Sequence, residues 1–206
     1  MNQILICKKD RKNYIKYQIL FLIFVLITCA SIIVLFIHIY KGFAGEELAQ
    51  KLNSSYSIST LYSNNISYDT TKSTSEPFVI GIIKIDKINL NYSILSSSNN
   101  DLLDISVCRF AGPMPNEVGN LCIAGHNYVD YKLFSRLNEL DIDDTLTIYD
   151  LSSNFKTYKI YDIYETKPND TSCTFQNTSG QRIVTLVTCN NVNGKRLVLH
   201  AKEIIA

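Results

Sequence analysis

A continuous apolar run over residues 19–39 constrains this chain more than any other feature of its sequence. Its only clearly polar members are Thr28, Ser31 and His38. A helix of this length spans roughly 30 Å at 1.5 Å per residue, which matches the hydrocarbon core of a bilayer. A cleaved signal peptide is the alternative, and Ala44-Gly45 keeps it open, but bulky residues fill positions 36–40 where small ones are needed. We predict an uncleaved transmembrane helix over residues 18–40.

Positive charge gathers before this run. Residues 1–17 carry a lone acid, Asp10, against the basic residues Lys8, Lys9, Arg11, Lys12 and Lys16. Because Lys and Arg are retained on the cytoplasmic side, we expect a cytoplasmic tail over residues 1–17. Everything after residue 40 is then expected outside the cell, in a single-pass cell-membrane protein.

The exported part has no surplus of positive charge. Residues 41–206 hold 15 Lys and Arg against 18 Asp and Glu. Binding to nucleic acid depends on basic patches that neutralise phosphates. We therefore expect no nucleic-acid partner.

Composition divides the exported part in two. Most residues from 53 to 75 are Ser, Thr or Asn, which cannot bury enough apolar surface to fold. We predict an extracellular polar stalk over residues 41–76 and a folded domain over residues 77–206.

The folded domain has mainly β patterning. Short apolar or alternating runs predict strands, here at residues 78–85, 90–95, 120–124, 145–149, 155–166, 182–189 and 195–204. Short helices are expected over residues 99–107 and 132–140, and loops over residues 111–119 and 167–181. Many short strands with few helices favour a barrel or a sandwich.

Four cysteines follow the anchor, namely Cys108, Cys122, Cys173 and Cys189. An even number outside the cell is compatible with disulfides, but the spacing is irregular and a domain of this size does not need them. We interpret Cys108 and Cys122 as small buried hydrophobic residues. No spacing of Cys and His matches a zinc site, and we expect no cofactor.

A candidate catalytic group surrounds Cys189, which ends the strand at residues 182–189. If this strand and the next form a hairpin, Arg196 lies beside Cys189, whereas His200 lies roughly 13 Å farther along. His126, at the end of the strand over residues 120–124, is then the better partner for the thiol. Each residue alone has a simpler interpretation: a buried cysteine, a turn histidine and a solvated arginine. Together they suit acyl transfer through a thioester.

This pattern resembles the sortase family of bacterial cysteine transpeptidases. The resemblance covers about residues 77–206 and is carried by the segments Thr185-Leu-Val-Thr-Cys189, Asn120-Leu-Cys-Ile-Ala-Gly-His126, Phe134-Ser-Arg-Leu137 and Arg196-Leu-Val-Leu199. It implies a closed β-barrel of about eight strands with short helices, preceded here by a transmembrane helix and a stalk.

The resemblance also implies roles for the three residues. Cys189 would be the nucleophile that cleaves a Leu-Pro-x-Thr-Gly-like sorting signal between Thr and Gly. His126 would be the general acid/base, and Arg196 would stabilise the oxyanion and the substrate. The partners implied are secreted proteins with sorting signals and an amine of peptidoglycan or its lipid-linked precursor, on a Gram-positive type of bacterium.

Departures from the family bear on the subclass. No second apolar span follows Leu199, no lid precedes the domain, and the loop over residues 167–181 lacks a helical period. We therefore expect a class D-like or class A-like enzyme rather than a class B or a pilin-type sortase. Calcium binding is a minor alternative that would use the acidic residues Asp141, Asp143, Asp144 and Glu165.

Other interpretations stay open. A papain-like peptidase places its Cys before its His, and an L,D-transpeptidase places the two almost adjacent, whereas 63 positions separate His126 from Cys189. A membrane-tethered binding module without activity is a further alternative, as is a pilin-type sortase. A disulfide between Cys173 and Cys189 under oxidising conditions is a hypothesis beside the simpler one of an incidental loop thiol.

Overall fold

The N-terminal unit contains one long apolar helix. A computed structural model describes residues 14–37, 51, 78–128, 132–190 and 193–205, and the chain forms two compact units, Met1–Gly45 and Glu46–Ala206. Within the described residues, the helix Tyr14–Ile37 contains an 18-residue window with a mean hydropathy of 3.2, and it is long and apolar enough to cross a membrane. It suggests a single membrane anchor. The tail before residue 14, positions 38–40 and the stalk apart from Lys51 lie outside the described residues.

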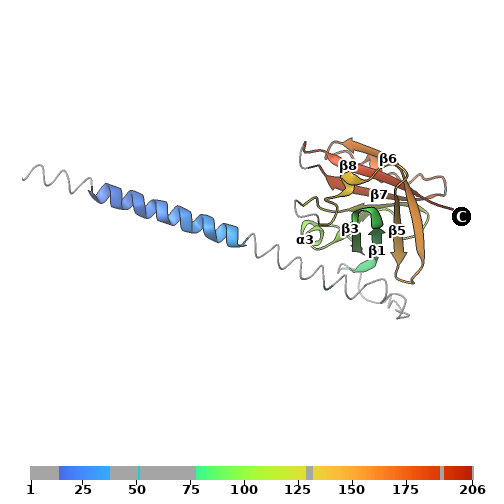
Figure 1. The fold of residues 1–206 in the computed structure, drawn as a ribbon, viewed down its shortest axis with the longest axis horizontal. Coiled ribbons are helices and arrows are strands. Elements are labelled where there is room, and N and C mark those ends of the chain that lie inside the picture. The colour runs from blue at the N-terminus through green and yellow to red at the C-terminus, as the bar shows by residue number, and fades with distance from the viewer. Residues whose placement is uncertain (1–13, 38–50, 52–77, 129–131, 191–192, 206) are drawn as a thin grey trace, which may run out of the picture. The chain divides into compact units, whose positions relative to one another are not determined.

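The second unit is a closed β-barrel (Figure 1). Its strands are β1 (Val79–Ile85), β2 (Leu90–Leu95), β3 (Val107–Ala111), β4 (Gly119–Ala124), β5 (Thr145–Asp150), β6 (Phe155–Thr166), β7 (Arg182–Cys189) and β8 (Arg196–Glu203). They follow the order β1-β2-β3-β4-β7-β8-β6-β5 around the barrel. The predicted mainly β barrel with few short helices is confirmed.

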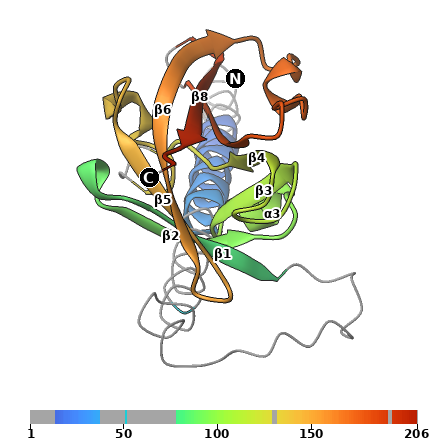
Figure 2. The ribbon, with the colours of Figure 1, turned by 90° about the vertical axis from the view of Figure 1, so that its right-hand side faces the viewer.

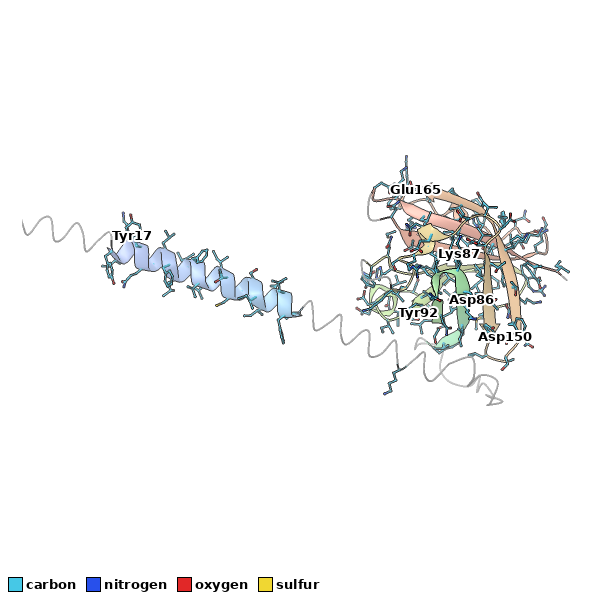
Figure 3. The ribbon with its side chains drawn as sticks, in the orientation of Figure 1. Tyr17, Asp86, Lys87, Tyr92, Asp150 and Glu165 are labelled. Atoms are coloured by element: carbon cyan, nitrogen blue, oxygen red, sulfur yellow. The ribbon has the colours of Figure 1, made fainter. Side chains whose placement is uncertain are left out.

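Two of the strand pairs are parallel and the others are antiparallel. β4 pairs with β7, and β2 with β3, in the parallel direction. The long strand β6 runs beside β8, as Figure 2 shows, with a register shift between Ile160 and Asp162. Figure 3 shows Asp150, the last residue of β5, and Glu165, near the end of β6, at opposite ends of the barrel.

Strand alternation fills the barrel and leaves a distinct outer face. The core includes Leu121 and Ile123 of β4, Val184 and Leu186 of β7, and Leu199 and Ala201 of β8. The intervening residues of these strands therefore point out of the barrel. Part of the outer face is covered, since Cys108 packs with Val79, Leu95 and Leu102 in a second cluster beside the helix α3 (Asn100–Leu103).

The two predicted helices are shorter than the patterns indicate. In the first, the Asn99 side chain accepts a hydrogen bond from Leu102 N, as a helix cap does, but α3 ends at Leu103. Val107, at the predicted helix end, instead begins strand β3, which the sequence patterns missed. Burial of Val107 beside Ile94 of β2 outweighs its local helical pattern.

The second predicted helix, over residues 132–140, reduces to the 3-10 helix η2 (Leu137–Glu139). Leu133 has φ 50°, in the left-handed region, and this interrupts any continuous helix. The apolar spacing is nevertheless used, because Phe134 and Leu137 both pack in the barrel core. The described part of the barrel unit also contains the 3-10 helices η1 (Asp86–Ile88) and η3 (Ser172–Thr174).

Phe134 provides a test of this core. Its side chain is fully buried, whereas Phe175 is 74% exposed. We predict that Phe134→Ala lowers the free energy of unfolding by about 3–5 kcal/mol, because it leaves a cavity, and that Phe175→Ala changes it by less than about 0.5 kcal/mol. Guanidinium unfolding of the detergent-solubilised chain, followed by tyrosine near-UV circular dichroism, measures both. Equal effects of the two substitutions would refute this assignment of the core.

Candidate functional site

Cys189 is the exposed thiol of the barrel. It is the last residue of β7, while Cys108, Cys122 and Cys173 are all buried. Burial raises the pKa of Cys108 and of Cys122 to about 12, and it also raises the pKa of Cys173. These three thiols are therefore held in the unreactive protonated form. Among the described barrel cysteines, Cys189 alone is open to a substrate.

Parallel pairing of β4 with β7 brings His126 to the same end of the barrel. Ala124 and Val187 are the last paired residues of the two strands. His126 and Cys189 each lie two positions further along, so the same register places them side by side. Three hydrogen bonds secure this segment: Gly125 N to Val187 O (3.2 Å), Thr188 Oγ1 to Gly125 O (2.8 Å) and Asn127 Nδ2 to Cys189 O (2.7 Å). The thiol and the imidazole thus share one rigid backbone frame.

The turn after β4 is packed tightly against the core. A Cβ on Gly125 would lie 2.7 Å from the Phe134 ring, so only glycine fits before the histidine. Phe134 N in turn donates to His126 O (3.0 Å), and Asn127 forms a bridge with Leu133. Strained backbone of the kind seen at Leu133 is common where a fold fixes a functional side chain.

Arg196 begins β8 directly opposite Cys189. Its other neighbour in the sheet is Thr166 of β6. The Arg196 guanidinium also counteracts the effect of burial on the pKa of Cys173, which places its charge near that loop residue. The structure therefore brings together all three predicted site residues at one end of β4, β7 and β8.

Glu165 of β6 holds the loop between Cys189 and Arg196. Its carboxylate accepts hydrogen bonds from Asn190 Nδ2 and, at 2.9–3.0 Å, from Asn193 Nδ2, and Lys195 Nζ lies 3.5 Å away. The bonds from Asn193 and Asn190 hold the pKa of Glu165 below its usual range. The carboxylate stays charged at neutral pH, so the loop remains tied to β6.

A chain of hydrogen bonds crosses the outer face of β6, β8, β7 and β4, on the same strands that carry the site. Thr185 Oγ1 donates to Asn120 Oδ1 (2.6 Å) and contacts His200 Nδ1 (2.8 Å), while Tyr164 Oη contacts His200 Nε2 (3.2 Å). Because the single hydroxyl proton of Thr185 goes to Asn120, His200 must donate from Nδ1 and accept from Tyr164 at Nε2. Burial lowers the pKa of His200, which favours this neutral form. Both ring nitrogens of His200 are thus committed to structure.

The same chain anchors the loop between β6 and β7. Asn120 Nδ2 donates to the carbonyl oxygens of Cys173 (2.8 Å) and Phe175 (3.2 Å). The Cys173 side chain packs with Val187 and Val198 on the outer face of the barrel. This loop therefore rests on the strands that carry Cys189 and Arg196.

The acidic residues that were candidates for binding calcium do not form one group, and each contacts other side chains. Asp141 and Asp144 lie 2.8 and 2.6 Å from Lys87 Nζ, and Asp143 lies 3.2 Å from Lys159 Nζ. Glu165 is engaged by the loop after β7, as described above. Within the described ranges, no three His, Cys, Asp or Glu residues gather in a metal-binding group.

Comparison with known proteins identifies the family. The sequence model of the sortase domain matches residues 83–204. The chain belongs to the sortase family. Sortases are cysteine transpeptidases, and the β-barrel with a thiol at the end of β7 accords with this membership. A search of curated proteins gives no match.

Solved structures similar to this sortase come from several classes. A Clostridium perfringens sortase D5 transpeptidase has a TM-score of 0.60 at 26% identity, covering 77% of this chain and 97% of that one. Sortase C1 of Streptococcus agalactiae has a TM-score of 0.55 at 26% identity, covering 62% and 68%. Sortase A of Corynebacterium diphtheriae shares the fold, with a TM-score of 0.57 at 23% identity over 65% and 64% of the two chains.

The structure adds residues to the site that the sequence patterns missed. Asn127 donates to Cys189 O, and Asp104 and Tyr128 lie beside His126. Asn127 and Tyr128 follow the histidine directly, so their positions could have been suspected. Asp104 gives no such signal, because only the fold brings α3 close to the end of β4.

Thr185 provides a test of the outer network. Thr185→Val deprives Asn120 Oδ1 and His200 Nδ1 of a buried partner, so we predict a loss of about 1–3 kcal/mol in unfolding free energy. Thr185→Ser keeps the hydroxyl and serves as the matched control, with a smaller loss. Guanidinium unfolding measures both, and limited proteolysis reports faster cleavage within residues 167–181 for the valine variant. A valine variant as stable and as resistant as the serine variant would argue against the network.

Proposed function

We propose that this sortase is a membrane-anchored transpeptidase that joins secreted proteins to the cell wall. It cleaves a Leu-Pro-x-Thr-Gly-like sorting signal between Thr and Gly and transfers the protein to an amine of peptidoglycan or its lipid-linked precursor. The observation that carries the proposal is the exposed Cys189 thiol, tied through β4 to His126 and opposite Arg196 in the sheet.

Each of the three residues has a defined task in the proposed reaction. The thiolate of Cys189 attacks the Thr carbonyl carbon and forms a C–S bond. The C–N bond to Gly then breaks, and its nitrogen takes a proton from His126. An incoming amine attacks the thioester, gives its proton to His126 and displaces the Cys189 thiolate. The Arg196 fork donates hydrogen bonds to the oxyanion formed in each half of the reaction.

We also propose a membrane topology and a sortase subclass for this chain. The basic residues before the helix Tyr14–Ile37 support a cytoplasmic N-terminus and an extracellular barrel. The loop between β6 and β7 carries only the short helix η3 within the described residues, which supports a class D-like enzyme, with class A-like as the alternative. Likeness to the sortase D5 transpeptidase over 97% of that chain supports the same assignment.

We further propose that the reaction proceeds without calcium. Lys87 already neutralises Asp141 and Asp144, and it would have to be displaced before a cation could bind there. Glu165 holds the β7–β8 loop through Asn190 and Asn193. The four acidic residues therefore have partners that compete with a metal ion.

Cleavage of a sorting-signal peptide tests the function. The detergent-solubilised chain is incubated with fluorescence-quenched peptides of the form Leu-Pro-x-Thr-Gly, with and without an amine acceptor. We predict cleavage between Thr and Gly, and a new amide when the amine is present. Cys189→Ala abolishes both reactions. Arg196→Lys lowers kcat about 100-fold, because the lysine ammonium keeps the positive charge but lacks the planar, forked donors of the guanidinium.

Cys29→Ala is the matched control, since it removes the exposed thiol of the helix Tyr14–Ile37, which is not part of the barrel that carries the site. Its activity should equal that of the unmodified chain. Full activity of the Cys189→Ala variant would contradict transpeptidation by Cys189. So would hydrolysis of the peptide by the unmodified chain that yields no amide product at any amine concentration. Absence of any cleavage or thioester adduct would favour the inactive binding module, and transfer to a pilin lysine alone would favour the pilin-type alternative.

A further inference from the structure

The side chains of Asp104, His126 and Tyr128 lie together, although Asp104 follows α3 and the other two follow β4. Asp104 caps the C-terminal end of α3, and its Oδ1 lies 3.4 Å from His126 Nε2. Tyr128 Oη donates a hydrogen bond of 2.6 Å to the same Oδ1. The rings of Tyr128 and His126 lie 5.2 Å apart, centroid to centroid, in a tilted arrangement. The carboxylate is thus held beside one particular nitrogen of the imidazole.

We propose that Asp104 is a positioning residue for His126 in the transpeptidation reaction, with Tyr128 fixing its carboxylate. Asp104 faces Nε2, so Nδ1 is the nitrogen that gives a proton to the leaving amine and takes one from the incoming amine. This inference rests on the proposed function, and in particular on the role of His126 as general acid/base.

Simple electrostatics explains why the arrangement favours proton transfer. When His126 is neutral, a carboxylate at Nε2 accepts the N–H there and leaves the lone pair on Nδ1. When His126 is protonated, the same carboxylate pairs with the cation while Nδ1–H points toward the group that needs the proton. The 3.4 Å between Asp104 Oδ1 and His126 Nε2 is long for a hydrogen bond, and a small rotation of the imidazole would shorten it to hydrogen-bond length.

The fold supplies this contact through backbone that is itself well fixed. Asn99 caps α3 by accepting from Leu102 N at 2.8 Å, and Ser106 N bonds Leu102 O just after Asp104. Leu102 is buried against the barrel, so α3 cannot move away without exposing it. On the other side, Asn127 ties the segment of His126 and Tyr128 to Cys189 O. Both halves of the contact are therefore built on the barrel wall.

Substrates with different leaving groups separate positioning from general damage. A peptide amide needs a proton from His126 when the C–N bond breaks, whereas a peptide thioester releases a thiolate that needs none. The experiment measures kcat/KM of the detergent-solubilised chain for a Leu-Pro-x-Thr-Gly peptide and for the matching thioester at the Thr–Gly bond. This parameter reports the steps up to acylation of Cys189.

The variants are Asp104→Asn and Tyr128→Phe, with Asp101→Asn as the matched control. Asp101 is an exposed acid on the same short helix. We expect Asp104→Asn to lower kcat/KM for the amide about 5- to 20-fold, less than loss of a buried triad carboxylate because this pair is partly exposed. Tyr128→Phe should lower it less. Both variants should keep kcat/KM for the thioester within about twofold, and Asp101→Asn should leave both substrates unaffected.

Two results would overturn the inference while leaving the proposed function intact. One is an equal loss on the amide and the thioester, which would mean that Asp104 acts only through the fold. The other is no loss on the amide, which would mean that Asp104 has no role. His126→Ala distinguishes a failure of the function itself: if the unmodified chain cleaves no amide, or if His126→Ala cleaves it normally, the role of His126 falls and the inference falls with it.

Discussion

Parallel pairing of β4 with β7 is the constraint on which the site depends. The two strands end at the same edge of the barrel, so residues 63 positions apart in the chain become neighbours. Hydrogen bonds from Asn127 to Cys189 O and from Thr188 to Gly125 O extend this pairing beyond the strands themselves. Arg196 then follows from the antiparallel hairpin of β7 and β8. The Cys189 thiol, the His126 imidazole and the Arg196 guanidinium are therefore all carried by, or directly follow, neighbouring strands of one sheet.

The outer face of that sheet links the site to its surroundings. Its polar chain, buried at Thr185 and Asn120 and half-buried at Tyr164 and His200, crosses four adjacent strands. Asn120 then holds the β6–β7 loop by two carbonyl oxygens, and Glu165 holds the β7–β8 loop. A buried polar network of this kind fixes one arrangement, because every broken bond leaves an unsatisfied group. Both loops that border Cys189 are set by the barrel in this way.

The sequence patterns predicted the strands more completely than the contacts within the site. The alternation in residues 155–166 and the apolar run ending at Cys189 predicted β6 and β7 with their observed bounds. The short strand β3 was missed, because Val107–Ala111 has no clear period and joins the barrel through pairing with β2 and β4. Alternation of side chains along the β7–β8 hairpin predicted that Arg196 lies beside Cys189. The approach of His126 depends instead on parallel pairing of strands that are distant in the sequence. The residues alone only suggested His126, and the contact of Asp104 with it had no sequence signal at all.

A thioester between the peptide and Cys189 would be recorded directly in the mass of the intact chain. The detergent-solubilised chain is mixed with a Leu-Pro-x-Thr-Gly peptide without an acceptor amine, quenched in acid and analysed whole and after digestion. We predict an added mass equal to that of the peptide up to Thr, located on Cys189 and removed by hydroxylamine. An adduct on another residue, or cleavage of the peptide with no adduct at any time point, would contradict it.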